Sequence, residues 1–147
     1  MVIQINHTAL YLMLQFYTMS NTFSTMGLHL RYRLWIAELN ADTTLLRIFD
    51  DYIAELATKN EMAELTKGIT HFKVKFMHLR TESDTLKHEM HLVKMKLAAL
   101  SKKAGEEQQD ASIQSGHALL EKNYTDFRET FNTTQKEFVQ FADEWLK

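Results

Sequence analysis

The sequence predicts an all-α protein in which three long antiparallel helices form a coiled-coil-like helical bundle. Apolar residues recur at alternating spacings of three and four in three separate segments, as they do in helices that pack along a seam. The 147-residue chain also has no proline, although roughly seven would be expected from average composition. Proline breaks helix interiors, so its absence favours long helices. Short connections between the segments predict that neighbouring helices are antiparallel.

The first expected helix spans about residues 31–58. Its seam consists of Trp35, Leu39, Asp42, Leu46, Phe49, Ile53 and Leu56. Asp42 is the one charged interruption, and we expect it to form a salt bridge with Arg80 or Lys73. Leu45, Ile48 and Tyr52 widen the apolar face, which predicts that this helix contacts more than one neighbour.

The second expected helix spans about residues 61–102, with Asn60 as its N-cap. Its seam consists of Leu65, Ile69, Phe72, Phe76, Leu79, Ser83, Leu86, Met90, Val93, Leu97 and Leu100. Gly68 lies beside this seam, where a small residue allows another helix to approach closely.

The third expected helix spans about residues 106–146 and begins after a turn at Gly105. Its seam consists of Ile113, His117, Leu120, Tyr124, Phe127, Phe131, Thr134, Phe138, Phe141 and Trp145. We expect His117 to be neutral and hydrogen-bonded, to help fix the alignment of the helices, and to make stability sensitive to pH.

The two turns predict which residues face each other. If the chain turns at Asn60, facing residues of the first and second helices have numbers that sum to about 119. If it turns at Gly105, facing residues of the second and third helices have numbers that sum to about 210. Ser83 would then lie near Trp35 and Phe127. Phe76 would lie near Asp42 and Thr134.

Charged residues flank the predicted seams. Basic residues recur every seven positions on the second helix, at Lys73, Arg80, Lys87 and Lys94. By the expected alignment they lie near Glu121, Glu129 and Glu137 of the third helix. We interpret this edge as interhelical ion pairing.

Several classes of function have no support in the sequence. The chain has no cysteine for disulfides or thiolate ligands, and its net charge is -2; interleaved acids argue against a nucleic-acid partner. The most apolar stretch, residues 9–17, is far below the roughly 20 residues of a membrane span. No glycine-rich phosphate loop or nucleophile elbow is present. We therefore expect a cytoplasmic, non-enzymatic protein without cofactor, small-molecule substrate or membrane partner.

The histidine-rich stretch from His71 to His91 is the one candidate for a metal site. His78 and Glu82 are four residues apart, and His88 and His91 are three apart, so each pair could share one ion. However, "HEMH" lacks the spacing of the H-E-x-x-H zinc motif, and no histidine follows an acid by three residues as in di-iron bundles. We expect a solvated or ion-pairing face and no metal ligands; the alternative is a metal- or small-ligand-binding bundle.

One end of the expected bundle has an open side. A first helix starting near Arg31 would cover the second helix only to about residue 88, leaving Leu92 and Met95 beyond it. Ile113, Leu119 and Leu120 of the third helix should lie at the same end. Apolar surface of this kind marks interfaces, so we expect cover from residues 1–30 or from another subunit. The chain would then be a homo-oligomer or would bind a protein partner at this open end.

Residues 1–30 differ from the rest of the chain, because they contain no acidic residue, lysine or arginine. The segment "MGLHLRYRL" at its end alternates like a strand. We expect residues 1–30 to be an extension outside the bundle of residues 31–147, either a poorly ordered tail or an over-long gene model.

The segments "LWIAELN", "THFKVKF" and "DTLKHEMH" resemble those of a family of small bacterial helical proteins, mainly from Bacteroidetes, to which no activity is assigned. The matching positions are Trp35, Glu38, Leu39, His71, Phe72, Leu86, His88 and Glu89. The resemblance covers about residues 34–100 and implies a bundle that begins near Trp35. Together with the seams, it favours a protein-interaction or scaffold role with self-association.

Overall fold

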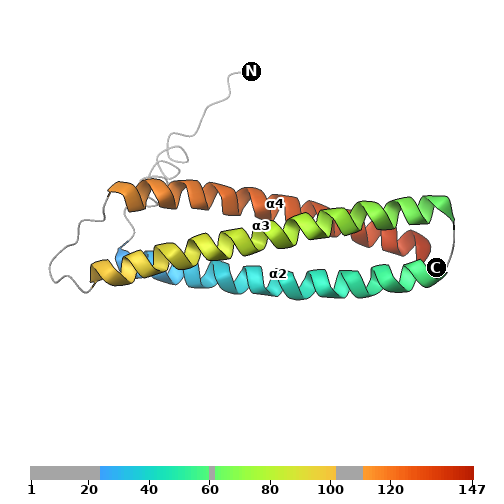
Figure 1. Cartoon of the computed structure of the whole chain (residues 1–147), viewed down its shortest axis with the longest axis horizontal. Coiled ribbons are helices and arrows are strands. Elements are labelled where there is room, and N and C mark those ends of the chain that lie inside the picture. The colour runs from blue at the N-terminus through green and yellow to red at the C-terminus, as the bar shows by residue number, and fades with distance from the viewer. Residues whose placement is uncertain (1–23, 60–61, 102–110) are drawn as a thin grey trace, which may run out of the picture.

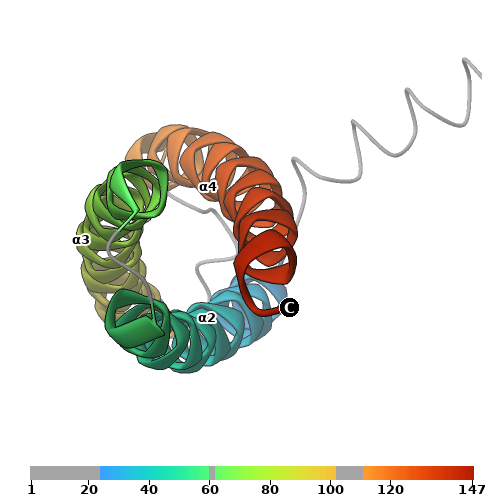
Figure 2. The same cartoon turned by 90° about the vertical axis from the view of Figure 1, so that its right-hand side faces the viewer.

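A computed structural model describes residues 24–59, 62–101 and 111–147. It contains three helices, α2 (Thr25–Lys59), α3 (Ala63–Ser101) and α4 (Ala111–Trp145). The helices lie side by side, and each runs opposite to the one before it (Figure 1). Seen from the end, they wind around a common axis (Figure 2). The prediction of an all-α helical bundle is confirmed.

The predicted seams form the core. From Leu65 to Leu97 on α3 and from Ile113 to Phe138 on α4, every seam position except Val93 is buried, and Val93 packs against the core. Phenylalanine rings from all three helices meet in one layer: Phe138 lies 5.1 Å from Phe49 and from Phe76, measured between ring centroids. Such tilted and edge-on contacts add to the stabilisation that burial provides.

The start of α2 differs from the prediction. The helix begins at Thr25, six residues before Arg31, and "MGLHLRYRL" belongs to it rather than to a strand. Ser24 caps this end, because its Oγ accepts a hydrogen bond of 3.0 Å from the backbone N–H of Gly27. The added segment buries Leu28, which is 2% exposed. Tyr32, at the start of the predicted helix but outside its predicted seam, is also buried, at 0%. Part of the expected open end is therefore covered by α2 itself.

The predicted alignment holds for one helix pair and fails for the other. Between α3 and α4, Phe72 contacts Phe138 and Lys75 contacts Glu137, so the residue numbers sum to 210 and 212 as expected. Between α2 and α3, Phe76 contacts Phe49, a sum of 125 rather than 119. The turn centre was placed too early. With α2 ending at Lys59 and α3 beginning at Ala63 the sum becomes 122, which accounts for half of the difference.

This shift changes the predicted neighbours. Trp35 stacks on His117 and Tyr124 of α4 instead of lying beside Ser83. On the α2 side Phe76 packs on Phe49 rather than beside Asp42. The predicted proximity of Phe76 and Thr134, whose numbers sum to 210, agrees with the α3–α4 alignment. The proposed caps and turns at Asn60 and Gly105 lie outside the described residues.

The predicted ion-pair edge between the basic residues of α3 and the acids of α4 is also wrong in its partners. Arg80 pairs with Asp50 of α2, and Lys87 pairs with Asp84 on its own helix. Glu137 does pair with α3, but through Lys75 at 2.8 Å. Glu121 pairs with Arg31 of α2. Arg80 thus pairs with α2 and Lys75 with α4, because the two residues lie on opposite sides of the α3 seam.

The expected close approach at Gly68 is confirmed. A Cβ atom built at this position would overlap the ring of Phe141, lying 2.6 Å from Cζ. The wide apolar face of α2 is confirmed only in part. The helix does contact both α3 and α4, but Ile48 and Tyr52 are exposed. None of the described helices is long and apolar enough to cross a membrane.

Candidate functional site

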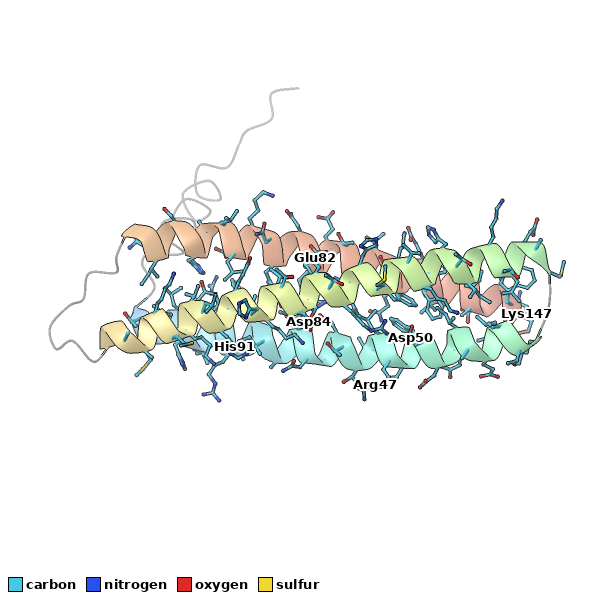
Figure 3. All side chains as sticks on the ribbon, in the orientation of Figure 1. Arg47, Asp50, Glu82, Asp84, His91 and Lys147 are labelled. Carbon is cyan, nitrogen blue, oxygen red and sulfur yellow. The ribbon has the colours of Figure 1, made fainter. Side chains whose placement is uncertain are left out.

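The histidine-rich stretch lies on the outer surface of α3. His71, His78, His88 and His91 are all exposed. Figure 3 shows Glu82 at the edge of α3 beside α4 and His91 at the edge beside α2. Within the described parts of the chain, no three His, Asp or Glu side chains are placed to hold a metal ion.

His78 and Glu82 nevertheless share an open groove between α3 and α4. The groove has a volume of about 370 Å³ and is also lined by Lys75 of α3 and by Glu129 and Thr133 of α4. The helical spacing therefore brings His78 and Glu82 together as the sequence suggested, and α4 adds a second carboxylate to the same groove.

A second polar region lies between α2 and α4, where side chains from the two parallel helices meet. The hydroxyl of Tyr32 and Nδ1 of His117 are 2.7 Å apart, in a buried hydrogen bond. Nε2 of His117 lies 3.6 Å from Oε2 of Glu121, and Glu121 also accepts a 3.0 Å hydrogen bond from Arg31. Because Nε2 faces a carboxylate, we assign the ring proton to Nε2 and the hydroxyl of Tyr32 as the donor to Nδ1.

The expectation that His117 is buried and hydrogen-bonded is confirmed. Burial lowers its pKa below the ordinary 6.5, and the charge of Glu121 opposes this effect. Burial also raises the pKa of Tyr32 above its usual value, and repulsion by the charge of Glu121 raises it further. Trp35 stacks on the imidazole at 6.1 Å between centroids, so aromatic surface keeps water from this hydrogen bond.

Asp42 forms the second part of this region. Its Oδ2 lies 2.8 Å from Nη1 of Arg128 on α4. The predicted partners, Arg80 and Lys73, are wrong, because Asp42 faces α4 rather than the basic edge of α3. Nη1 of Arg128 also lies 2.9 Å from Oε1 of Glu38, which accepts a hydrogen bond from the hydroxyl of Tyr124 through its other oxygen.

Water is nearly excluded from the Asp42–Arg128 pair. The Asp42 side chain is 5% exposed and that of Arg128 is 16% exposed. Oδ2 accepts no hydrogen bond from the described residues, so the contact is an ion pair without hydrogen-bond alignment. Desolvation outweighs the attraction of Arg128 and raises the pKa of Asp42 from 3.8 to about 6. The guanidinium also lies over the rings of Phe127 and Phe131.

Two features of the sequence point to this region, although neither led to its prediction. A lone acid on an apolar seam requires a cationic partner, and Arg128 follows the seam residue Phe127 on the third helix. Asp42 was instead assigned to the basic residues of α3, because the direction in which it faces, towards α4, was not predicted. Tyr32 was missed because it precedes the seam assigned to the first helix.

The outer face of α2 carries an apolar stripe that the bundle does not cover. We define the α2 stripe as Leu30, Leu34, Ala37, Ala41, Leu45, Ile48 and Tyr52. All of these residues are exposed except Leu45, which is half-buried. Leu30 and Leu34 are 58% and 61% exposed, and Ile48 and Tyr52 are 45% and 43% exposed. Leucine and isoleucine at such exposure, repeated along one helix face, are typical of an interface.

A smaller apolar group remains at the expected open end. We define the open-end patch as Leu92, Met95 and Leu119, which are 44%, 69% and 61% exposed. The numbers of Leu92 and Leu119 sum to 211, as for the α3–α4 contacts, so the two lie at the same level of the bundle. Ile113 and Leu120, which were expected at the same end, are 7% and 4% exposed and belong to the core. Of the residues expected there, only the patch itself remains uncovered.

No protein-family model, curated protein or solved structure matches this chain. The resemblance of residues 34–100 to the bacterial helical family therefore stays a prediction.

Proposed function

We propose that this protein is a helical scaffold that binds other proteins through exposed apolar helix surface and associates with copies of itself. The α2 stripe carries this proposal. It runs over 23 residues of a 35-residue helix, or about 33 Å at about 1.5 Å per residue. Leaving this surface in water is unfavourable by about 25 cal/mol per Å² of apolar area, so a partner that covers it gains affinity.

The open-end patch supports a second contact. It lies on α3 and α4, whereas the stripe lies on α2, so one chain offers two separate apolar surfaces. Two such surfaces allow a scaffold to join a copy of itself at one and a different protein at the other.

The solution mass of the full chain tests this proposal. One chain has a mass of 17.3 kDa. Light scattering at increasing concentration should give twice this value or more. A mass of one chain at every concentration would contradict self-association.

Metal or small-ligand binding by α3 is the alternative, and the groove shared by His78, Glu82 and Glu129 favours it. Calorimetric titration of the untagged protein with zinc would test it. Stoichiometric binding that is lost in Glu129→Gln but kept in Glu64→Gln, on another part of the surface, would support this function over the scaffold.

A further inference from the structure

The α2 stripe has a symmetric spacing. Counted from Ala41, its other members lie 4, 7 and 11 residues away in both directions. At 3.6 residues per turn these offsets all fall within about 40° of one line along the helix. The spacing of the stripe is therefore the same from either end, with Ala41 at the centre, Ala37 and Leu45 on either side of it, and large residues towards both ends.

A symmetric stripe of this kind fits a second copy of itself running in the opposite direction. In a two-fold symmetric pair, each surface meets its own copy, and residue i meets residue j while j meets i. Centred on Ala41, the pairing joins residues whose numbers sum to 82. Leu34 then meets Ile48, and Leu30 meets Tyr52.

The sizes of the paired side chains agree with this arrangement. Ala41 meets Ala41 of the second copy at the symmetry axis, where two small residues let the helices approach. Ala37 meets Leu45, a small residue against a large one. The larger pairs, Leu34 with Ile48 and Leu30 with Tyr52, lie farther from the axis, so the close approach falls where the side chains are small.

One pair of charged residues beside the stripe also agrees with this arrangement. Arg33 and Asp51 are exposed, and helical geometry places both on the edge of the stripe away from α4. Antiparallel pairing about Ala41 brings Arg33 within one turn of Asp51 of the second copy, and symmetry repeats this contact. In a parallel pair these charges would lie 18 residues apart, about 27 Å.

We propose that two copies of this chain associate through the α2 stripe, antiparallel, with the two-fold axis at Ala41. This inference rests on the proposed function, since it names the partner at one of the two apolar surfaces. It also fixes the alignment of the partners to a single residue.

The absence of cysteine from the chain makes a sharp test possible. Ala41→Cys places a single thiol at the axis, where it meets its own copy within disulfide distance. Under mild oxidation the full-length variant should become a disulfide-linked dimer. Leu30→Cys and Tyr52→Cys serve as matched controls, because each thiol lies 22 residues from its own copy along the pair, about 33 Å.

The two controls should each stay unlinked when oxidised alone, and should link when unfolded, mixed and refolded together. Linking of Leu30→Cys alone would indicate a parallel pair and overturn the inference. If the wild-type chain is dimeric but Ala41→Cys does not link, this interface is wrong while self-association stands. A monomeric wild-type chain would contradict both.

Discussion

Nη1 of Arg128 on α4 lies 2.8 Å from Oδ2 of Asp42 on α2, and the two side chains are 16% and 5% exposed. This ion pair joins the two parallel helices of the bundle at a position where the core is otherwise apolar and aromatic. Because a buried charge without a partner is costly, any shift of α2 along α4 is penalised. We expect the pair to specify the alignment of these helices more than it adds net stability.

Replacement of Arg128 by Met should destabilise the protein strongly. Met keeps packing on Phe127 and Phe131 but leaves Asp42 buried without its cation. We expect the free energy of unfolding, measured by urea denaturation, to fall by about 3 kcal/mol. The double variant Asp42→Leu/Arg128→Met should recover much of this loss. A loss in Arg128→Met below about 1 kcal/mol, as for an exposed pair, would contradict a buried role.

Asp42→Asn should change how stability depends on pH. Burial raises the pKa of Asp42 from 3.8 to about 6, so the folded state binds a proton more tightly than the unfolded state does. This contribution is fully present below pH 3.8 and is lost as the pH rises to about 6. The stability of the wild type relative to Asp42→Asn should therefore fall by about 2 kcal/mol between these limits. A difference that is constant across this range would show that Asp42 keeps its ordinary pKa.

His117 should change the stability with pH in the opposite direction from Asp42. Burial lowers its pKa below 6.5, so in acid the unfolded chain takes up a proton that the folded chain does not. This contribution is present above pH 6.5 and is lost as the pH falls through that value towards the folded pKa. We expect the stability of the wild type relative to His117→Gln to decrease below pH 6.5. Direct titration of the imidazole by NMR would check the cause, and a pKa above 6.5 would refute it.

Gly68 of α3 and Gly116 of α4 provide a matched pair. Gly68→Ala should destabilise the protein by about 1–2 kcal/mol, because the added methyl group overlaps the ring of Phe141. Gly116 has no atom within 4 Å of the corresponding position, so Gly116→Ala should stabilise its helix by about 0.5–1 kcal/mol. Thermal unfolding of both variants would check this. Equal shifts of the melting temperature in the two would mean that Phe141 does not constrain Gly68.

The core of this fold could be predicted from the sequence because the apolar residues recur with an unambiguous helical period. Positions such as Phe76, Phe127 and Leu86 recur every three or four residues and are buried as expected. The close contact at Gly68 was also predictable, because a glycine weakens a helix interior and is tolerated beside a seam where a neighbouring helix needs the space.

The pairing of charges could not be predicted to the same precision. Ion pairs depend on the alignment of helices to within one turn, and an error in the turn centre moves every partner on α2. They also depend on which neighbouring helix a residue faces: Asp42 was assigned to Arg80 or Lys73 of α3, although it faces α4 and its partner is Arg128. The α2 stripe was recognised only at Leu45, Ile48 and Tyr52. Leu30 precedes the expected helix of residues 31–58, and Leu34, Ala37 and Ala41 lie within that helix but were not counted in its apolar face.

The solution mass of matched charge variants tests the proposed role of α2 most directly. Leu34→Glu places a carboxylate on the stripe, and Val74→Glu places one at a similarly exposed apolar position of α3. Light scattering of the full chain should show a dimer for the wild type and for Val74→Glu, and a single chain of 17.3 kDa for Leu34→Glu, with equal helix content in all three. A dimer that survives in Leu34→Glu, or one that dissociates equally in Val74→Glu, would contradict association through the α2 stripe.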